Sequence, residues 1–115
     1  MEISFTFRNV EPSEAMKNYV REKLLRLQKY AHGPVHADVV FFHERHLHCV
    51  EISLNSGGQR YSGSHQGTDM YEAIDLALDK VTRQMRDQND FWASDRRRSS
   101  PGWMLNGRYG GGNEY

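Results

Sequence analysis

The amino-acid sequence predicts an α+β fold, a two-layer sandwich in which a four-stranded sheet carries two helices on one face. One observation is a strict alternation of apolar and polar residues at the start of the chain and again in its middle. The other is a pair of segments in which apolar residues recur every three or four positions. These elements follow in the order β-α-β-β-β-α, so we expect one sheet face to pack on the helices and the other to meet water.

The N-terminal part of the chain predicts a strand followed by a helix. From Ile3 to Phe7 every second residue is apolar, which is the pattern of a strand with one buried face. After a turn-like segment over residues 9–13, apolar residues recur at helical spacing, and Gly33-Pro34 provides a stop. The first helix is therefore predicted from about Ser13 to about Tyr30.

The middle of the chain predicts three further strands. Apolar residues alternate over 35–41 and again over 50–54, with Glu44-Arg45 between the two runs, which indicates a hairpin. The segment Asn55-Ser56-Gly57-Gly58 predicts a turn, because Asn and Gly tolerate positive φ. The polar run from Gln59 to Gln66 is then the fourth strand, which we expect at an edge of the sheet.

The second helix is predicted from about Met70 to about Gln88. Asp69 and Glu72 have the spacing of a capping box, and apolar residues recur behind them at helical spacing. From Asn89 onward no period persists, and the chain contains a Ser-Ser-Pro-Gly breaker, an arginine triplet and a glycine triplet. The sequence thus predicts one domain over residues 1–88 and a flexible tail, rich in Arg, aromatic residues and Gly, over residues 89–115.

Composition narrows the classes of function. The 115 residues fit one domain with a single core, and 15 Lys and Arg balance 15 Asp and Glu. Any binding of nucleic acid must therefore come from cations that gather locally. Cys49 is the single cysteine, so an intramolecular disulfide is impossible and a reducing compartment is expected. No signal peptide or membrane-spanning run is visible, which predicts a cytoplasmic protein with no membrane partner.

Two sets of cations stand out on the predicted helices. Residues three apart are neighbours on a helix, so each set forms one slanting ridge. We call them the helical ridges: Lys23, Arg26 and Lys29 on the first helix, and Lys80, Arg83 and Arg86 on the second. Side by side, such ridges would neutralise several phosphates of a structured RNA. The alternative is a plain solvated surface, because the second helix places acidic residues early and cations late, as the helix dipole favours without a ligand.

The histidines are a second candidate site. His43, His46 and His48 lie close together near the hairpin, and imidazole is a good ligand for zinc or copper. No cysteine or carboxylate completes a metal-ligand spacing, so the sequence predicts surface histidines and neither a metal nor a cofactor. Cys49 has no clear activating neighbour, and no phosphate-binding loop or nucleophile elbow occurs, so an enzyme is not expected.

The predicted tail mixes rings that stack on bases with cations that bind phosphates, as single-strand binders do. An ordinary flexible extension explains the same composition. The candidate contacts in the tail are Trp92, Arg96, Arg97 and Arg98.

Two segments carry a resemblance to a known family. They read NVEPSEAMKNYVREKLLRLQKY at residues 9–30 and GTDMYEAIDLALDKVTRQM at residues 67–85. Both strongly resemble the ribosome hibernation promoting factor and ribosome-associated inhibitor family, in its short, sigma-54 modulation protein-like form. The likeness covers roughly the first 88 residues, and its most specific part runs from Asp69 to Arg83.

The resemblance implies a fold similar to a double-stranded RNA-binding domain and a function without catalysis. Members bind the small ribosomal subunit between head and body, over the sites of messenger RNA and tRNA, and block translation in starved or stationary cells. The implied partners are therefore ribosomal RNA and the 70S ribosome, with the protein a monomer off the ribosome. The family's basic positions carry over to Lys23, Arg26, Lys80 and Arg83.

The other ridge positions carry over less completely. Lys29 matches only some members, and Arg86 lies where the sequence departs from the family pattern. The resemblance leaves open whether the chain promotes or opposes the pairing of ribosomes. The leading hypothesis is thus a translation silencer that docks through the helical ridges. The second hypothesis, of a different class, is a protein-interaction or metal-responsive module that uses the histidine-rich hairpin and the aromatic tail.

Overall fold

The predicted order of elements, β-α-β-β-β-α, is confirmed. The computed structural model describes the backbone of residues 1–99 and the side chains of residues 1–89. Its elements are β1 (Glu2–Arg8), α1 (Glu14–Leu25), the short 3-10 helix η1 (Arg26–Tyr30), β2 (Val35–Glu44), β3 (Leu47–Ser56), β4 (Gln59–Gly67) and α2 (Met70–Ser99). The chain divides into two units, Met1–Met85 and Arg86–Tyr115, and the whole sheet belongs to the first.

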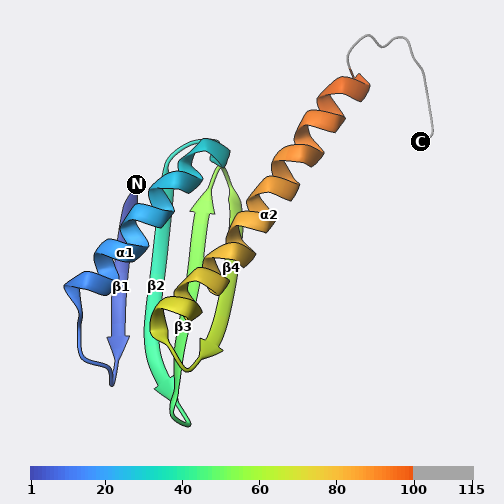
Figure 1. Ribbon diagram of the computed structural model, residues 1–115. Coiled ribbons are helices and arrows are strands. Elements are labelled where there is room, and N and C mark those ends of the chain that lie inside the picture. The colour runs from blue at the N-terminus through green and yellow to red at the C-terminus, as the bar shows by residue number, and fades with distance from the viewer. Residues whose placement is uncertain (100–115) are drawn as a thin grey trace. The chain divides into compact units, whose positions relative to one another are not determined.

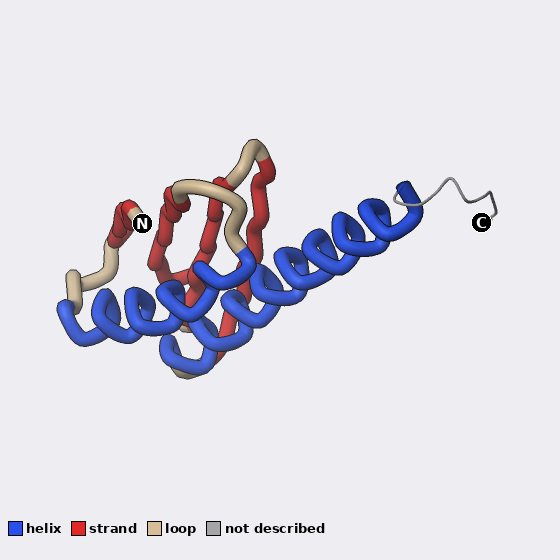
Figure 2. Tube along the Cα trace, turned by 90° about the horizontal axis from the view of Figure 1, so that it is seen from above, coloured by secondary structure: helices blue, strands red, loops and turns tan. Residues whose placement is uncertain are grey.

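The sheet of the first unit is four-stranded and mixed, with strand order β1-β2-β3-β4 (Figure 1). β1 pairs with β2 in parallel, whereas the β2–β3 and β3–β4 pairs are antiparallel. α1 and the first half of α2 lie on the same face of this sheet (Figure 2), as the sequence predicts. β4 is an edge strand, which confirms the expectation drawn from its polar sequence.

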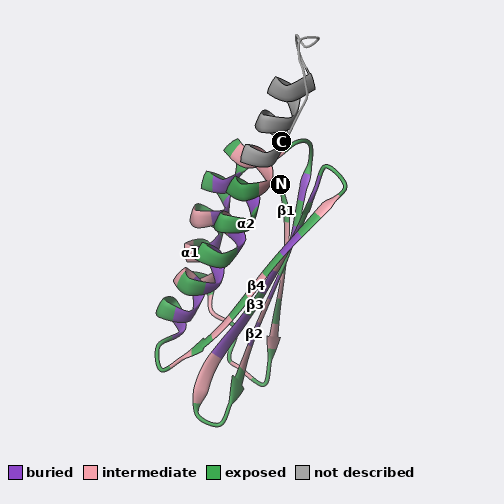
Figure 3. Ribbon diagram, turned by 90° about the vertical axis from the view of Figure 1, so that its right-hand side faces the viewer, coloured by how far each residue is buried: buried purple, intermediate pink, exposed green. Residues whose placement is uncertain are grey.

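The core lies between that sheet face and the two helices (Figure 3). Every second residue from Val35 to Phe41 is buried, because successive side chains of a strand point to opposite faces. Phe5 and Phe7 stack on Phe41 at centroid distances of 6.3 and 4.7 Å and so extend the core to β1. The opposite face of the sheet is open and carries the alternate, mostly polar residues of the strands.

The turns agree with the local chemistry of their residues. Gly57 and Gly58 join β3 to β4 with φ values of +57° and +78°, as the sequence predicts for this glycine pair. Arg45 and His46 join β2 to β3, and their φ values of 52° and 68° are also positive. A pair of positive φ values twists a two-residue turn in the sense that matches the flanking strands.

Both helices begin close to the predicted positions, and each has a capping side chain at its start. Ser13 Oγ accepts a hydrogen bond of 3.2 Å from the Met16 N–H, and Asp69 Oδ1 accepts one of 3.2 Å from the Tyr71 N–H. The first helix reaches Tyr30 as predicted, but its last part tightens into η1. Such tightening is common at the end of an α-helix.

The predicted end of the second helix is wrong. The sequence predicts an end near Gln88, whereas α2 continues through Ser99. The apolar period does fade after Met85, but residues 89–99 contain neither glycine nor proline, so nothing in their chemistry breaks a helix before Pro101. The division into a domain over 1–88 and a flexible tail over 89–115 stays a prediction.

Candidate nucleic-acid interface

The first helical ridge crosses the junction of α1 and η1. Lys23 lies in the last turn of α1, and Arg26 and Lys29 lie in η1 with exposed side chains. A 3-10 helix has three residues per turn, so Arg26 and Lys29 stand one above the other. The Lys29 ammonium lies 5.3 Å from the centroid of the Tyr30 ring.

Lys23 differs from its ridge neighbours because it turns toward α2. Its Nζ lies 3.5 Å from Asp75 Oδ1, and its side chain is 33% exposed. The same ammonium lies 5.0 Å from the centroid of the Tyr19 ring. Lys23 therefore forms an ion pair between the helices instead of extending freely into solvent.

A cluster of four side chains fills the seam between α1 and α2, and we call it the seam cluster: Tyr19, Lys23, Tyr71 and Asp75. The Tyr19 hydroxyl donates a hydrogen bond of 2.7 Å to Asp75 Oδ1, and the Tyr71 ring meets the Tyr19 ring edge-on at 5.0 Å. This hydrogen bond to Asp75 is the main cause that raises the pKa of Tyr19, with burial second. Asp75 therefore partly neutralises Lys23 and fixes its position.

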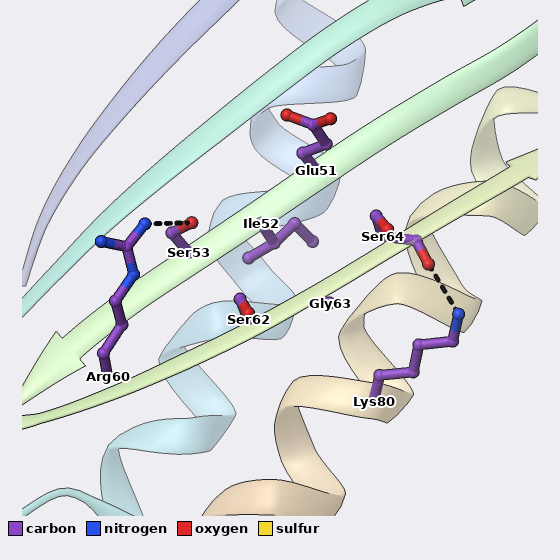
Figure 4. Close-up of a pocket in the computed structure, with 8 residues that line it drawn as sticks. All are labelled: Glu51, Ile52, Ser53, Arg60, Ser62, Gly63, Ser64 and Lys80. Carbon is purple, nitrogen blue, oxygen red and sulfur yellow. Dashed lines mark hydrogen bonds between the residues drawn. The ribbon is translucent and has the colours of Figure 1, made fainter.

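Lys80 is held at the outer edge of the sheet. Its Nζ donates a hydrogen bond of 2.7 Å to the Ser64 carbonyl oxygen of β4 (Figure 4). A carbonyl orients an ammonium without neutralising it, and the ammonium's other N–H groups stay available to a further acceptor. Lys80 also borders a pocket of about 420 Å³ on the open face, together with Glu51, Ile52, Ser53, Arg60, Ser62, Gly63 and Ser64.

The remaining cations of the second ridge point to solvent. Arg83 is exposed on α2, three residues after Lys80 and away from the buried Val81 and Met85. Within residues 1–89, no carboxylate is recorded in an ion pair with Arg26, Lys80 or Arg83. Arg86 is exposed as well, but it opens the second unit.

The tail candidates cannot be placed in the same way. Trp92, Arg96, Arg97 and Arg98 fall within the helical backbone of α2, but their side chains lie outside the described residues.

The histidine cluster is smaller than its spacing predicts. His43 and His48 face each other across β2 and β3, with 2.9 Å between Nε2 and Nδ1. His46 lies in the turn, so it does not share a strand face with His48 as a regular strand would require. Among residues 1–89, no group of three or more potential metal ligands converges.

Two residues that hold this surface together are not among the sequence candidates. Tyr19 and Asp75 lie 56 residues apart, in the two segments that carry the family resemblance. That shared location was the available signal. Their contact cannot be read from either segment alone, because it depends on how α1 and α2 pack.

Comparisons with known proteins identify the family of this chain. The family model described as "Sigma 54 modulation protein / S30EA ribosomal protein" matches residues 3–91. The chain belongs to this family. The ribosome hibernation promoting factor of Escherichia coli (strain K12) is 33% identical over 90 residues, which cover 78% of this chain and 95% of that relative. The ribosome hibernation promotion factor of Deinococcus radiodurans is 34% identical over 99 residues, which cover 82% of this chain and 52% of the longer relative.

Solved structures support the same family and fold. The N-terminal domain of Thermus thermophilus Protein Y superposes with a TM-score of 0.71 at 31% identity, covering 76% of this chain and 99% of that one. A ribosomal subunit interface protein from Coxiella burnetii has a TM-score of 0.63 at 18% identity and covers 82% of this chain and 99% of its own. At that identity the second match supports the fold alone. The described helices include none that is long and apolar enough to cross a membrane.

Proposed function

We propose that this chain is a ribosome hibernation factor. It binds the RNA of the small ribosomal subunit, covers the sites of messenger RNA and tRNA, and silences translation in starved or stationary cells. The curated relatives named above are ribosome hibernation factors, and their similarity spans most of this chain. The observation that carries the proposed mode of binding is the exposed, unneutralised set of cations on the helical layer, Arg26, Lys80 and Arg83.

The proposed contacts are phosphate contacts, and the ridge residues contribute unequally. Lys80 is oriented by the Ser64 carbonyl, so little side-chain entropy is lost when a phosphate binds its remaining N–H groups. Arg26 and Arg83 are exposed and offer forked N–H donors that match a phosphate. Lys23 contributes less, because Asp75 competes for its charge. Lys29 and Arg86 are supporting contacts in this proposal.

The action is steric and needs no chemical step. A domain that occupies the decoding region excludes messenger RNA and tRNA by its volume, while phosphate contacts supply affinity without reading a base sequence. The protein in this proposal acts in the cytoplasm, as a monomer off the ribosome, on the small subunit and the 70S ribosome. The metal-responsive alternative has no support from the histidine geometry or from the comparisons.

The test is co-sedimentation of the whole chain with small ribosomal subunits at moderate salt. The charge-reversed pair Lys80→Glu and Arg83→Glu is compared with a control of equal charge change, Arg21→Glu and Arg45→Glu, at exposed positions off the helical ridges. We expect the ridge variant to lose most binding and the control to keep it. Unchanged binding of the ridge variant would refute the docking mode.

Salt dependence provides a second readout of the same proposal. Each phosphate contact releases counterions, so the logarithm of the binding constant falls linearly with the logarithm of the salt concentration. Replacing Lys80 by Met removes one proposed phosphate contact, so we expect the magnitude of that slope to fall by about one. A flat salt response of the unmodified chain would argue against phosphate contacts.

A further inference from the structure

Side chains of α2 form hydrogen bonds with backbone groups on the outer edge of β4. β4 ends the sheet, so one side of its backbone has no strand beside it. Ser62 and Ser64 are two residues apart, and their backbone groups therefore point to the same side. The Ser62 N–H donates to Gln84 Oε1 at 3.0 Å, and Gln84 Nε2 donates to the Ser62 carbonyl at 2.6 Å. Lys80 lies one turn before Gln84 on α2 and donates a hydrogen bond to the Ser64 carbonyl of β4.

The Gln84 amide reproduces what a neighbouring strand would offer. In an antiparallel pair, one residue receives a hydrogen bond from its partner and returns one to it. A primary amide has the same acceptor and donor as a peptide unit, and Gln84 uses both on Ser62. Gly63 makes this reach possible, since a Cβ there would lie only 2.5 Å from the Ala77 carbonyl oxygen of α2.

The sequence of β4 itself lacks the usual protection of an edge strand. Exposed edges are normally blocked by charged side chains, proline or a bulge. The sequence of β4, QRYSGSHQG, has Arg60 as its one Lys, Arg, Asp or Glu residue and contains no proline. An antiparallel pair of two copies centred on Gly63 would set Ser62 opposite Ser64 and Arg60 opposite Gln66. Among the residues of β4 itself, no like charges would oppose each other, so the side chains of this strand do not exclude a second copy.

We propose that the Gln84 side chain takes the place of a neighbouring strand at the β4 edge and so prevents a second copy of this chain from pairing there. Lys80 has a secondary role at this edge. Its ammonium can hold the Ser64 carbonyl and a phosphate together, and the paired bonds of Ser62 do not involve it. Gln84 therefore keeps the edge closed whether or not the ridge is bound to RNA. The inference concerns self-association and stands apart from ribosome binding.

The first test is amide hydrogen exchange at Ser62 in the free, full-length chain. With Gln84→Ala, we expect Ser62 exchange to accelerate about tenfold, the effect of losing roughly one hydrogen bond. Gln28 is an exposed glutamine in η1, so Gln28→Ala is the matched control and should leave the exchange rate of Ser62 unchanged. Gln84→Met keeps nearly the length of the side chain but removes both the acceptor of the Ser62 N–H and the donor to the Ser62 carbonyl, and it serves if the alanine variant folds poorly.

The second test is the oligomeric state by light scattering at concentrations used for NMR. We expect the unmodified chain and Gln28→Ala to be monomeric and Gln84→Ala to form dimers. Adding Ser62→Pro should restore the monomer, because the Ser62 N–H faces Gln84 rather than β3 and proline at an edge blocks pairing. A monomeric Gln84→Ala, an unchanged Ser62 exchange rate, or a dimer that survives Ser62→Pro would each overturn the proposal.

Discussion

Tyr19 and Asp75 join the two helices through a hydrogen bond of 2.7 Å from the phenol to the carboxylate. The Lys23 ammonium lies 3.5 Å from the same carboxylate oxygen. A single acidic side chain thus receives a hydrogen bond and an ion pair, both from α1. The seam cluster therefore links the packing of the helical layer to the positive charge that this layer presents to solvent.

Replacing Tyr19 by Phe is expected to destabilise the fold by about 1 kcal/mol at neutral pH. The variant keeps the ring but removes a hydrogen bond to a charged acceptor, and partial exposure reduces its value. Urea denaturation measures the difference. Tyr71→Phe is the matched control, since it keeps the edge-on ring contact and should change stability much less. Equal stability of Tyr19→Phe and the unmodified chain would show that the hydrogen bond contributes nothing.

The same pair predicts a pH dependence. Because the pKa of Tyr19 is raised in the folded state, the unfolded chain loses this proton first, above about pH 10. The contribution of Tyr19 is therefore complete below about pH 10 and declines as the pH rises through the folded pKa. We expect the stability difference between the unmodified chain and Tyr19→Phe to stay constant up to that pH and then to shrink. A difference that grows with alkaline pH would contradict this sign.

Asp75→Asn is expected to strengthen binding to the small subunit. The amide oxygen can still accept from Tyr19, but Lys23 regains its full charge. An exposed ion pair is worth up to about 1 kcal/mol, so the affinity should rise about two- to fivefold at low salt. Asp38→Asn removes one negative charge from the open face and is the control. An equal gain in both variants would indicate a general effect of net charge.

Gly63→Ala is expected to destabilise the chain by about 1–3 kcal/mol, the usual cost of overpacking. The new methyl group would lie 2.5 Å from the Ala77 carbonyl oxygen and 3.0 Å from Lys80 Cβ, so α2 would have to move away from β4. At Gly67, the nearest atom to an added Cβ is Glu72 Oε1 at 3.4 Å. Gly67→Ala should therefore be close to neutral in urea denaturation. Similar losses in the two variants would argue against close helix packing at Gly63.

The Cys49 thiol is expected to react slowly in the folded protein. It is 1% exposed, and burial raises its pKa, with the charge of Glu44 adding to the shift. A thiol reagent at mildly alkaline pH should label the native chain slowly and the urea-unfolded chain at once. The labelling rate should follow the unfolding equilibrium as urea is added. Rapid, complete labelling without urea would contradict the burial of this side chain.

Local patterns were sufficient to predict much of the fold. The alternation that ends at Phe41 and the cap at Asp69 depend on residues a few positions apart, so they can be read along the chain. The end of α2 differs from the prediction because the apolar period fades after Met85, whereas helix propensity persists until Pro101 approaches.

The sequence by itself determined the order of elements, the inward faces of the first three strands and the existence of the helical ridges. The tertiary structure alone decided the parallel β1–β2 pairing, the ion pair of Lys23 and the place of Lys80 and Gln84 at the β4 edge. The physical reason is separation along the chain. Asp75 lies 56 residues from Tyr19, and Gln84 lies 22 from Ser62. No local periodicity encodes such partners, because only the packing of α1 and α2 on the sheet brings them together.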